Sequence, residues 1–283
     1  MACKNCKSHP VIKLTNTNIS LCKNCFIHYF EKKVFKNVRK YDLLDDCKTI
    51  GVAVSGGKNS LIVLCLLNKL VKQRISKNVK IIAIHIDEGI KNYSEIASKT
   101  LKQFCKINQI ELKEYSIKNK KASPEIWVRY LLNKKARELK IERLATGHNL
   151  DAEAETIIMN QSRKDIERSA RLGPITGFQT EKKFIPRIKP LYFILEQESE
   201  IYAKIKEFRE LKNPYLADSY RENIKKFLNE VESKYPGTKY NIINSFLEIL
   251  PLLKNKFKTK IVSCESCGEP CSNKICSACK SLS

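Results

Sequence analysis

The sequence contains no apolar run long enough to cross a membrane, which argues against an integral membrane protein. Its first residues, Met1-Ala2-Cys3-Lys4, lack the apolar core of a signal peptide. We therefore expect a cytoplasmic protein with no membrane partner. The chain has no low-complexity tract, and its only internal repetition is a cysteine pattern at the two ends. Its 283 residues, 42% of them hydrophobic, suffice for one core domain with small appendages.

Acidic residues are scarce, because 30 Asp and Glu stand against 53 Lys and Arg, and the formal net charge is +23. Basic residues recur in clusters, for example at 36–40, 163–171 and 182–189. Such an excess predicts a polyanionic partner, most simply RNA or DNA. The alternative explanation is a lysine-rich proteome, in which lysines serve to solvate protein surfaces. The heavy use of Lys, Asn and Ile is consistent with that bias.

Cysteine is absent between Cys105 and Cys264, and most of the 12 cysteines stand near the two ends of the chain. In a cytosolic-looking protein this usage favours metal binding over disulfides. Two Cys-x-x-Cys pairs at each end predict one four-thiolate zinc site per end, hence two Zn²⁺ ions. The predicted ligands are Cys3, Cys6, Cys22 and Cys25 at one end and Cys264, Cys267, Cys276 and Cys279 at the other. His9, His28 and Cys271 are near enough in sequence to replace one ligand.

A glycine-rich stretch, Ser55-Gly56-Gly57-Lys58-Asn59-Ser60, joins a β-branched apolar run at 49–54 to a leucine-rich run at 61–67. The first run predicts a buried strand and the second predicts a helix. Paired glycines let the backbone approach an anion, and the free N–H groups of a helix start can bind it. The stretch therefore predicts a phosphate-binding loop with Lys58 as its charge. An ordinary strand-to-helix turn is the alternative, since the Walker spacing is not present.

Strand-like and helix-like segments alternate through the first half of the chain. Strands are expected at 49–54, 79–86, 110–116 and 143–146, and helices at 93–107, 124–139 and 151–159. This alternation predicts an α/β fold with a parallel sheet covered on both faces. The glycine loop, Asp87-Glu88-Gly89 and Thr146-Gly147-His148-Asn149 all follow strands, at the sheet edge where ligands bind in such folds. Their convergence predicts a nucleotide site.

Four segments are expected along the chain. They are a zinc module at 1–28, a nucleotide-binding α/β domain at 29–190, a helical nucleic-acid-binding region at 191–258 and a second zinc module at 259–283. A basic amphipathic helix is expected at 26–44. The helical region is expected to contain helices at 194–211, 218–234 and 241–253, with Pro236-Gly237 between the last two.

These motifs, in this order, resemble those of the tRNA 2-thiolation family of PP-loop ATP pyrophosphatases over essentially the whole chain. SGGKNS corresponds to the family's SGGKDS, and TGHNLDAEAET at 146–156 to TGHNLDDEAET. Further matches are DEGI at 87–90, RLGP at 171–174, RIKPL at 187–191 followed by Glu196 and Glu198, and PGTKY at 236–240. The resemblance implies a PP-loop core of the adenine nucleotide alpha hydrolase type.

The resemblance also implies a two-step reaction. ATP adenylates a uridine carbonyl oxygen of tRNA and releases pyrophosphate, and a sulfur donor, often a small ubiquitin-like carrier protein, then displaces AMP. By position, the residues expected to bind ATP are Ala53, Ser55, Gly56, Gly57, Lys58, Ser60, Ile86 and Gly147. Ala53 and Ile86 are equally compatible with plain strand core. The resemblance implies Mg²⁺ as a further cofactor and a homodimer as the assembly.

Lys58 and Asp151 are the expected catalytic residues. Asp151 is expected to help to place Mg²⁺ or the activated base, and a helix N-cap is its alternative role. His148 is expected either to contact phosphate or to hydrogen-bond within its turn.

The sequence also departs from the family. The Cys-x-x-Cys expected before the Arg129–Asn133 segment is replaced by Lys121-Ala122-Ser123-Pro124, and the third family cysteine by Asn213. Val128 stands just before Arg129, at the position where the family has a basic residue. The family's three thiolates hold an iron–sulfur cluster or form persulfides, so we predict that no iron–sulfur cluster is bound by this chain. Asn59 and Ala152 each replace an aspartate, which weakens Mg²⁺ binding because hard cations prefer charged oxygen ligands.

The predicted function is ATP-dependent tRNA uridine 2-thiolation, by an adenylating transferase whose sulfur step is altered or lost. One alternative is a non-catalytic, zinc-stabilised tRNA-binding subunit that supports an active paralogue. Another is a different adenylating tRNA modification that uses another nucleophile, such as an amine.

Overall fold

The computed structural model describes residues 2–14, 17–73, 79–117, 124–176, 184–208, 211, 219–257 and 262–281. The chain forms two compact units, each made of separated segments. One contains Met1–Leu43, His148–Pro174 and Lys189–Lys256, and the other contains Leu44–Gly147, Ile175–Ile188 and Phe257–Ser283. The boundaries of these units differ from those of the four contiguous segments expected from the sequence. We call them the helical unit and the sheet unit, respectively.

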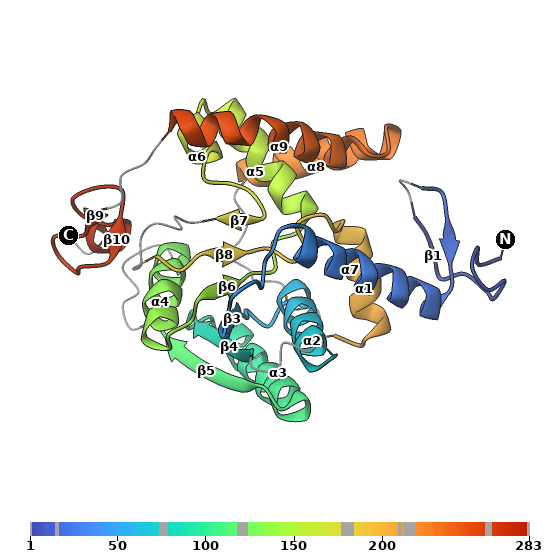
Figure 1. Cartoon of the computed structure of the whole chain (residues 1–283), viewed down its shortest axis with the longest axis horizontal. Helices are drawn as coiled ribbons and strands as arrows, with labels where there is room; N and C mark the ends of the chain where they lie inside the picture. The colour runs from blue at the N-terminus through green and yellow to red at the C-terminus, as the bar shows by residue number, and fades with distance from the viewer. Residues whose placement is uncertain are drawn as a thin grey trace. The chain divides into compact units, whose positions relative to one another are not determined.

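The sheet unit is built on six strands in the order β5-β4-β3-β6-β8-β7 (Figure 1). Their bounds are β3 Thr49–Ala53, β4 Lys80–Asp87, β5 Glu111–Ser116, β6 Arg143–Ala145, β7 Ile175–Thr176 and β8 Arg187–Ile188. All neighbouring strands are parallel except β7, which runs antiparallel to β8. The predicted α/β fold with a mostly parallel sheet is therefore confirmed.

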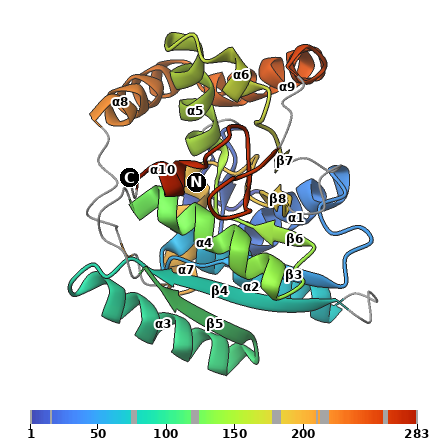
Figure 2. The same cartoon turned by 90° about the vertical axis from the view of Figure 1, so that its left-hand side faces the viewer.

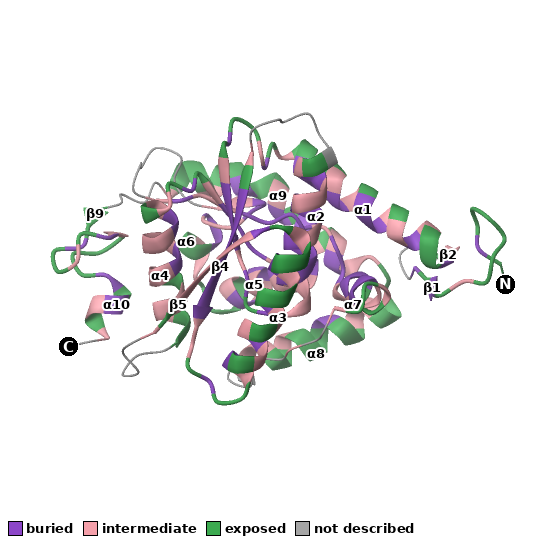
Figure 3. Cartoon of the chain, turned by 90° about the horizontal axis from the view of Figure 1, so that it is seen from below, coloured by how far each residue is buried: buried purple, intermediate pink, exposed green. Residues whose placement is uncertain are grey.

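Helices α2 (Lys58–Gln73), α3 (Tyr93–Asn108) and α4 (Pro124–Glu138) connect the strands of this sheet. Leu132 and Ala136 of α4 join one buried cluster with Ile82, Ile84 and Ile86 of β4. Figure 3 shows β4 as buried along most of its length, as expected of an inner strand of a parallel sheet. The unit ends in a small module with strands β9 (Val262–Ser263) and β10 (Pro270–Cys271) and the short helix α10 (Ser277–Lys280).

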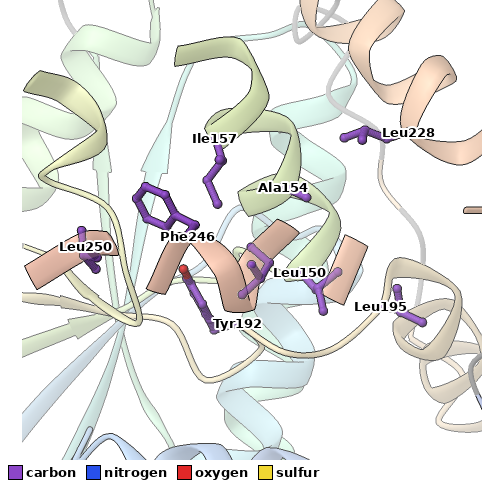
Figure 4. Packing of buried hydrophobic residues seen from close by; sticks show 9 residues of the cluster. Leu150, Ala154, Ile157, Tyr192, Leu195, Leu228, Phe246 and Leu250 are labelled. Carbon is purple, nitrogen blue, oxygen red and sulfur yellow. The ribbon is translucent and has the colours of Figure 1, made fainter. Parts of the chain in front are cut away.

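The helical unit begins with a hairpin of β1 (Ile12–Lys13) and β2 (Ser20–Leu21), followed by α1 (Lys23–Lys40). Its other helices are α5 (Leu150–Ser162), α6 (Ile166–Ser169), α7 (Glu196–Ile205), α8 (Ser219–Lys234) and α9 (Thr238–Lys256). Helices α5, α8 and α9 share one hydrophobic core with the segment before α7 (Figure 4). The core consists of Leu150, Ala154, Ile157, Tyr192, Leu195, Leu228, Ile243, Phe246 and Leu250.

Most of the longer elements start and end within a few residues of their expected positions, but α7 ends at Ile205, where a helix to residue 211 was expected, and β7 and β8 were not predicted. Each of these two strands has only two residues, too few to show an alternating pattern. Among the described helices, none combines the length and the apolar character that a membrane crossing needs.

Candidate nucleotide site and metal centres

The loop between β3 and α2 is closed by its own serine side chains. Ser60 Oγ donates a hydrogen bond to Gly57 O at 2.8 Å and accepts one from the Ser55 N–H at 3.3 Å. Gly56 has a φ of 86°, in the region that favours glycine. The backbone therefore turns sharply and leads directly into the first turn of α2, where the backbone N–H groups and the helix dipole favour an anion.

Gly147, which follows β6, lies against the backbone of this first turn. A Cβ atom at Gly147 would stand 2.9 Å from both Asn59 C and Ser60 N. Backbone atoms cannot rotate away as a flexible side chain can, so the close approach requires glycine. Because β6 and β3 are parallel neighbours, the carboxyl ends of two strands meet at one helix start. This is the arrangement expected for a nucleotide site in an open α/β sheet.

The end of β4 supports the same loop. The Tyr93 hydroxyl at the start of α3 donates to Ser55 O at 3.1 Å. Asp87 Oδ1 accepts the Gly89 N–H at 2.8 Å. Burial raises the pKa of Asp87, but hydrogen bonds from Ser94 and the Gly89 N–H outweigh it and leave the pKa below its usual value. Asp87 is thus a carboxylate at neutral pH. Tyr93 was not identified from the sequence, since a tyrosine at a helix start carries no phosphate-binding pattern.

The residues predicted to bind ATP all lie in the sheet unit. Ser55, Gly56, Gly57, Lys58 and Ser60 form the loop and the start of α2, and Gly147 packs on them. Ala53 and Ile86 belong to the hydrophobic cluster that α4 shares with the sheet. These two residues therefore contribute to the core of the sheet, whatever they add to an adenine pocket.

Asp151 and His148 belong to the helical unit. Asp151 Oδ2 accepts the N–H of Glu196 at 2.7 Å, and Oδ1 is bound by the ammonium group of Lys239. The N-cap of α5 is Asn149, whose Oδ1 accepts the Ala152 N–H at 3.0 Å. The alternative role of Asp151 as the N-cap is therefore wrong, and both its oxygens are engaged within this unit. Lys239 lies in the PGTKY motif, to which the sequence alone assigned no role.

A second buried ion pair joins α1 to α7. Lys33 Nζ lies 2.8 and 2.7 Å from the two carboxylate oxygens of Glu198, and the Tyr29 hydroxyl donates to Glu198 at 2.9 Å. The Tyr240 hydroxyl of α9 also contacts Lys33 Nζ. Burial lowers the pKa of Lys33, although the charge of Glu198 opposes the shift. Glu198 additionally accepts the Leu195 N–H at 2.9 Å, which caps α7.

Breaking the Lys33–Glu198 pair is expected to cost stability. Lys33→Met leaves the Glu198 carboxylate, 3% exposed, without its counter-charge. A fully buried pair loses about 3–5 kcal/mol in this way, and because the Lys33 side chain is 18% exposed we expect about 2–3 kcal/mol. Urea unfolding measures the free energy. Lys234→Met, which removes an exposed pair with Glu230, is the matched control and should cost about 0.5 kcal/mol or less. Equal losses in the two variants would contradict the assignment of a buried pair.

Both predicted sets of zinc ligands converge. The Sγ atoms of Cys3, Cys6, Cys22 and Cys25 all lie within 4.8 Å of one another, and so do those of Cys264, Cys267, Cys276 and Cys279. The separations include 3.4 Å for Cys6–Cys22 and 3.7 Å for Cys267–Cys276. Tetrahedral metal–sulfur bonds of about 2.3 Å place sulfurs about 3.8 Å apart, so each set fits one metal ion. His9, His28 and Cys271 belong to neither set.

The local backbone favours the thiolate form that binds a metal. The Cys22 N–H lowers the pKa of Cys3 to about 6, and the Cys276 N–H, 3.2 Å from Cys264 Sγ, lowers the pKa of Cys264 to about 6. A thiol with such a pKa is largely ionised at neutral pH. Each module thus supplies at least one preformed anionic ligand.

The C-terminal module packs on α4, as Figure 2 shows for α10. Trp127 and Tyr130 of α4 pack against the cluster of Cys264, Cys276 and Ala278. Glu269 of the module, 5% exposed, is bound by the guanidinium of Arg137. The module is therefore tied to α4 by both apolar packing and a partly buried ion pair.

The sheet order, the glycine loop and the close approach of Gly147 define a PP-loop nucleotide-binding protein. The model of the PP-loop domain family matches residues 28–228. Across the chain, identity is 35% to the tRNA-5-methyluridine(54) 2-sulfurtransferase of Pyrococcus horikoshii, covering 99% of this chain and 93% of that protein. The chain belongs to the PP-loop domain family and, within it, to the group of tRNA 2-thiolation proteins.

Two other proteins support this placement. A probable sulfurtransferase of Methanocaldococcus jannaschii is 35% identical, covering 94% of this chain and 83% of that protein. The solved structure of the U34-tRNA thiolase NcsA from Methanococcus maripaludis, with its [4Fe-4S] cluster, matches with a TM-score of 0.84. Identity to it is 29%, over 99% of this chain and 95% of that chain. Of the three positions where the family cysteines are expected, Lys121 and Asn213 lie outside the described residues, whereas Pro124 is the first residue of α4.

Proposed function

We propose that this chain is an ATP-dependent tRNA-modifying protein that activates a tRNA uridine for 2-thiolation. The observation that carries the proposal is the contact of Gly147 with the first turn of α2, which builds a phosphate site from two parallel strand ends. The relatives named as sulfurtransferases and the solved U34-tRNA thiolase support the same reaction over nearly the whole length of the chain. A net charge of +23 suits a tRNA substrate.

In this proposal the sheet unit binds ATP. The helix dipole and backbone N–H groups at the start of α2, together with the charge of Lys58, hold the phosphates and stabilise the departing pyrophosphate, which develops negative charge as the uridine oxygen attacks. Mg²⁺ bound with ATP would neutralise phosphate charge, and this chain would hold it more weakly because Asn59 and Ala152 are not carboxylates. Zn²⁺ in each four-cysteine site folds its module. A cytoplasmic homodimer served by a ubiquitin-like sulfur carrier is part of the same proposal.

A second candidate is a non-catalytic tRNA-binding subunit that supports an active paralogue. It is favoured by Asp151, whose two oxygens are occupied by Lys239 and the Glu196 N–H. It is also favoured by Val128, Asn59 and Ala152 at positions where the family has charged residues.

ATP–pyrophosphate exchange in the presence of cognate tRNA distinguishes the two candidates. We expect tRNA-dependent exchange that falls at least tenfold in Lys58→Met, because the lysine charge is lost from the phosphate site. Normal tRNA binding without exchange would instead establish the non-catalytic subunit. Mass spectrometry of tRNA nucleosides from a deletion strain then identifies the modified base, and a missing nucleoside without sulfur would point to another adenylating modification.

The sequence further predicts two zinc ions and no iron–sulfur cluster per chain. Metal and acid-labile sulfide analysis of anaerobically purified protein measures both quantities. We expect about two zinc ions per chain, which are lost when the eight predicted cysteine ligands are replaced. We expect no stoichiometric iron or sulfide. A stoichiometric cluster would show that ligands other than the three family cysteines hold it.

A further inference from the structure

One face of α4 carries a row of polar side chains next to strand β8. Arg129, Asn133 and Arg137 are four residues apart and therefore lie on one side of the helix. Asn133 Oδ1 accepts the Ile185 N–H at 3.3 Å, just before β8. Arg187 Nη2 of β8 donates to Arg129 O at 3.4 Å. The row and β8 are thus in direct contact within the sheet unit.

The charges in this region are not balanced. Glu269 forms an ion pair with Arg137 and also accepts a hydrogen bond from Asn133 at 3.3 Å. In the described part of the chain, neither Arg129 nor Arg187 forms an ion pair with a carboxylate. Arg187 is half-buried, and burial together with the charge of Arg129 lowers its pKa to about 10. Two neighbouring guanidinium groups without a counter-charge are unfavourable for the fold itself.

Arg129 lies towards the sheet edge that carries the glycine loop, and Arg187 lies level with the middle of β6 and β3, further from that edge. Helix α4 follows β5 and returns antiparallel to it, so its N-terminal half, with Arg129, lies near the carboxyl ends of the strands. Arg187 is in register with Leu144 of β6, three residues before Gly147. Its contact with Arg129 O links Arg187 to the side of the sheet where substrate phosphates arrive.

We propose that Arg129 and Arg187 form an oxyanion site that binds a phosphate group of the substrate. The identity of that substrate rests on the proposed function above. Guanidinium groups bind phosphate through two parallel N–H donors, and an arriving phosphate supplies the missing counter-charge. A phosphate of the tRNA backbone is the favoured source, because the glycine loop and Lys58 already serve the phosphates of ATP. Such a contact positions the RNA and reads no base.

The test compares Arg129→Gln, Arg187→Met and their double variant with Lys80→Gln. Lys80 begins β4, at the amino ends of the strands of the same sheet, and pairs with Glu111. The control therefore removes one positive charge at a position distant from the site. tRNA affinity is measured across a salt series and ATP affinity separately. We expect the slope of log K against log salt to fall by about 1 for each arginine removed, with ATP affinity unchanged. A fall in ATP affinity with an unchanged tRNA slope would assign the site to the polyphosphate of ATP. Variants that match Lys80→Gln in both measurements overturn the proposal.

Thermal melting separates this role from a structural one. Removing an unpaired, half-buried charge is expected to raise the melting temperature in Arg187→Met, although the variant binds tRNA less well. An arginine that only supports the fold would lower both quantities, and that result overturns the proposal. Arg129 is exposed, so we expect the Arg129→Gln variant to fold normally. Its salt slope can therefore be measured even if Arg187→Met does not fold. Wild-type protein that binds tRNA but does not exchange pyrophosphate refutes the catalytic function and leaves this site standing, whereas wild-type protein that binds neither tRNA nor ATP refutes both.

Discussion

Gly147→Ala is expected to weaken ATP binding by about a hundredfold, which corresponds to about 2.7 kcal/mol. The new Cβ would stand 2.9 Å from two backbone atoms of the first turn of α2. These atoms can relieve the clash only if the whole turn shifts. The N–H groups that point at the phosphates would move with it. Overpacking of this kind also destabilises the fold by about 1–3 kcal/mol. Titration calorimetry with ATP and urea unfolding measure the two effects.

Gly237→Ala is the matched control for this change. Nothing lies within 4 Å of a Cβ at Gly237, but its φ of +99° disfavours a side chain. The control should lose about 1 kcal/mol of stability and keep its ATP affinity. If Gly147→Ala binds ATP as tightly as this control does, the phosphate site does not depend on the approach of β6 to α2.

The parts of the site that could be predicted from the sequence are those encoded by neighbouring residues. The strand, the glycine turn and the helix start at 49–67 follow one another directly, so their geometry is local. The two four-cysteine groups could be predicted because Cys-x-x-Cys spacing brings two thiolates together without information from elsewhere. Both four-cysteine groups come together as expected.

Contacts between distant parts of the chain could not be predicted. Lys33 and Glu198 are 165 residues apart, and Lys239 and Asp151 are 88 apart. No local pattern states which charges will pair after folding, so the role of Asp151 was assigned from motif position alone. The Arg187–Arg129 contact escaped notice for the same reason, and also because β8 is too short to be recognised as a strand.

Loss of the C-terminal metal ion is expected to change the environment of α4. Structural zinc in small modules supplies about 10–16 kcal/mol of binding free energy, so the module should unfold without it. Trp127 packs against this module and is the only tryptophan of the chain, which makes its fluorescence a direct report. In Cys264→Ser/Cys267→Ser we expect the emission to shift to longer wavelength as water reaches the indole. The melting temperature should also fall, because Arg137 loses its partner Glu269.

Cys3→Ser/Cys6→Ser is the control, because it removes the same number of thiolates from the other metal site. It should release one zinc ion and leave Trp127 emission unchanged, since Trp127 packs against the C-terminal module. The same comparison tests the link to the oxyanion site. When the module unfolds, Asn133 loses Glu269 but keeps the Ile185 N–H, so the Arg129–Arg187 contact should persist and the salt slope of tRNA binding should stay unchanged. A slope that falls in the C-terminal variant would mean that the metal module itself carries part of the phosphate contact.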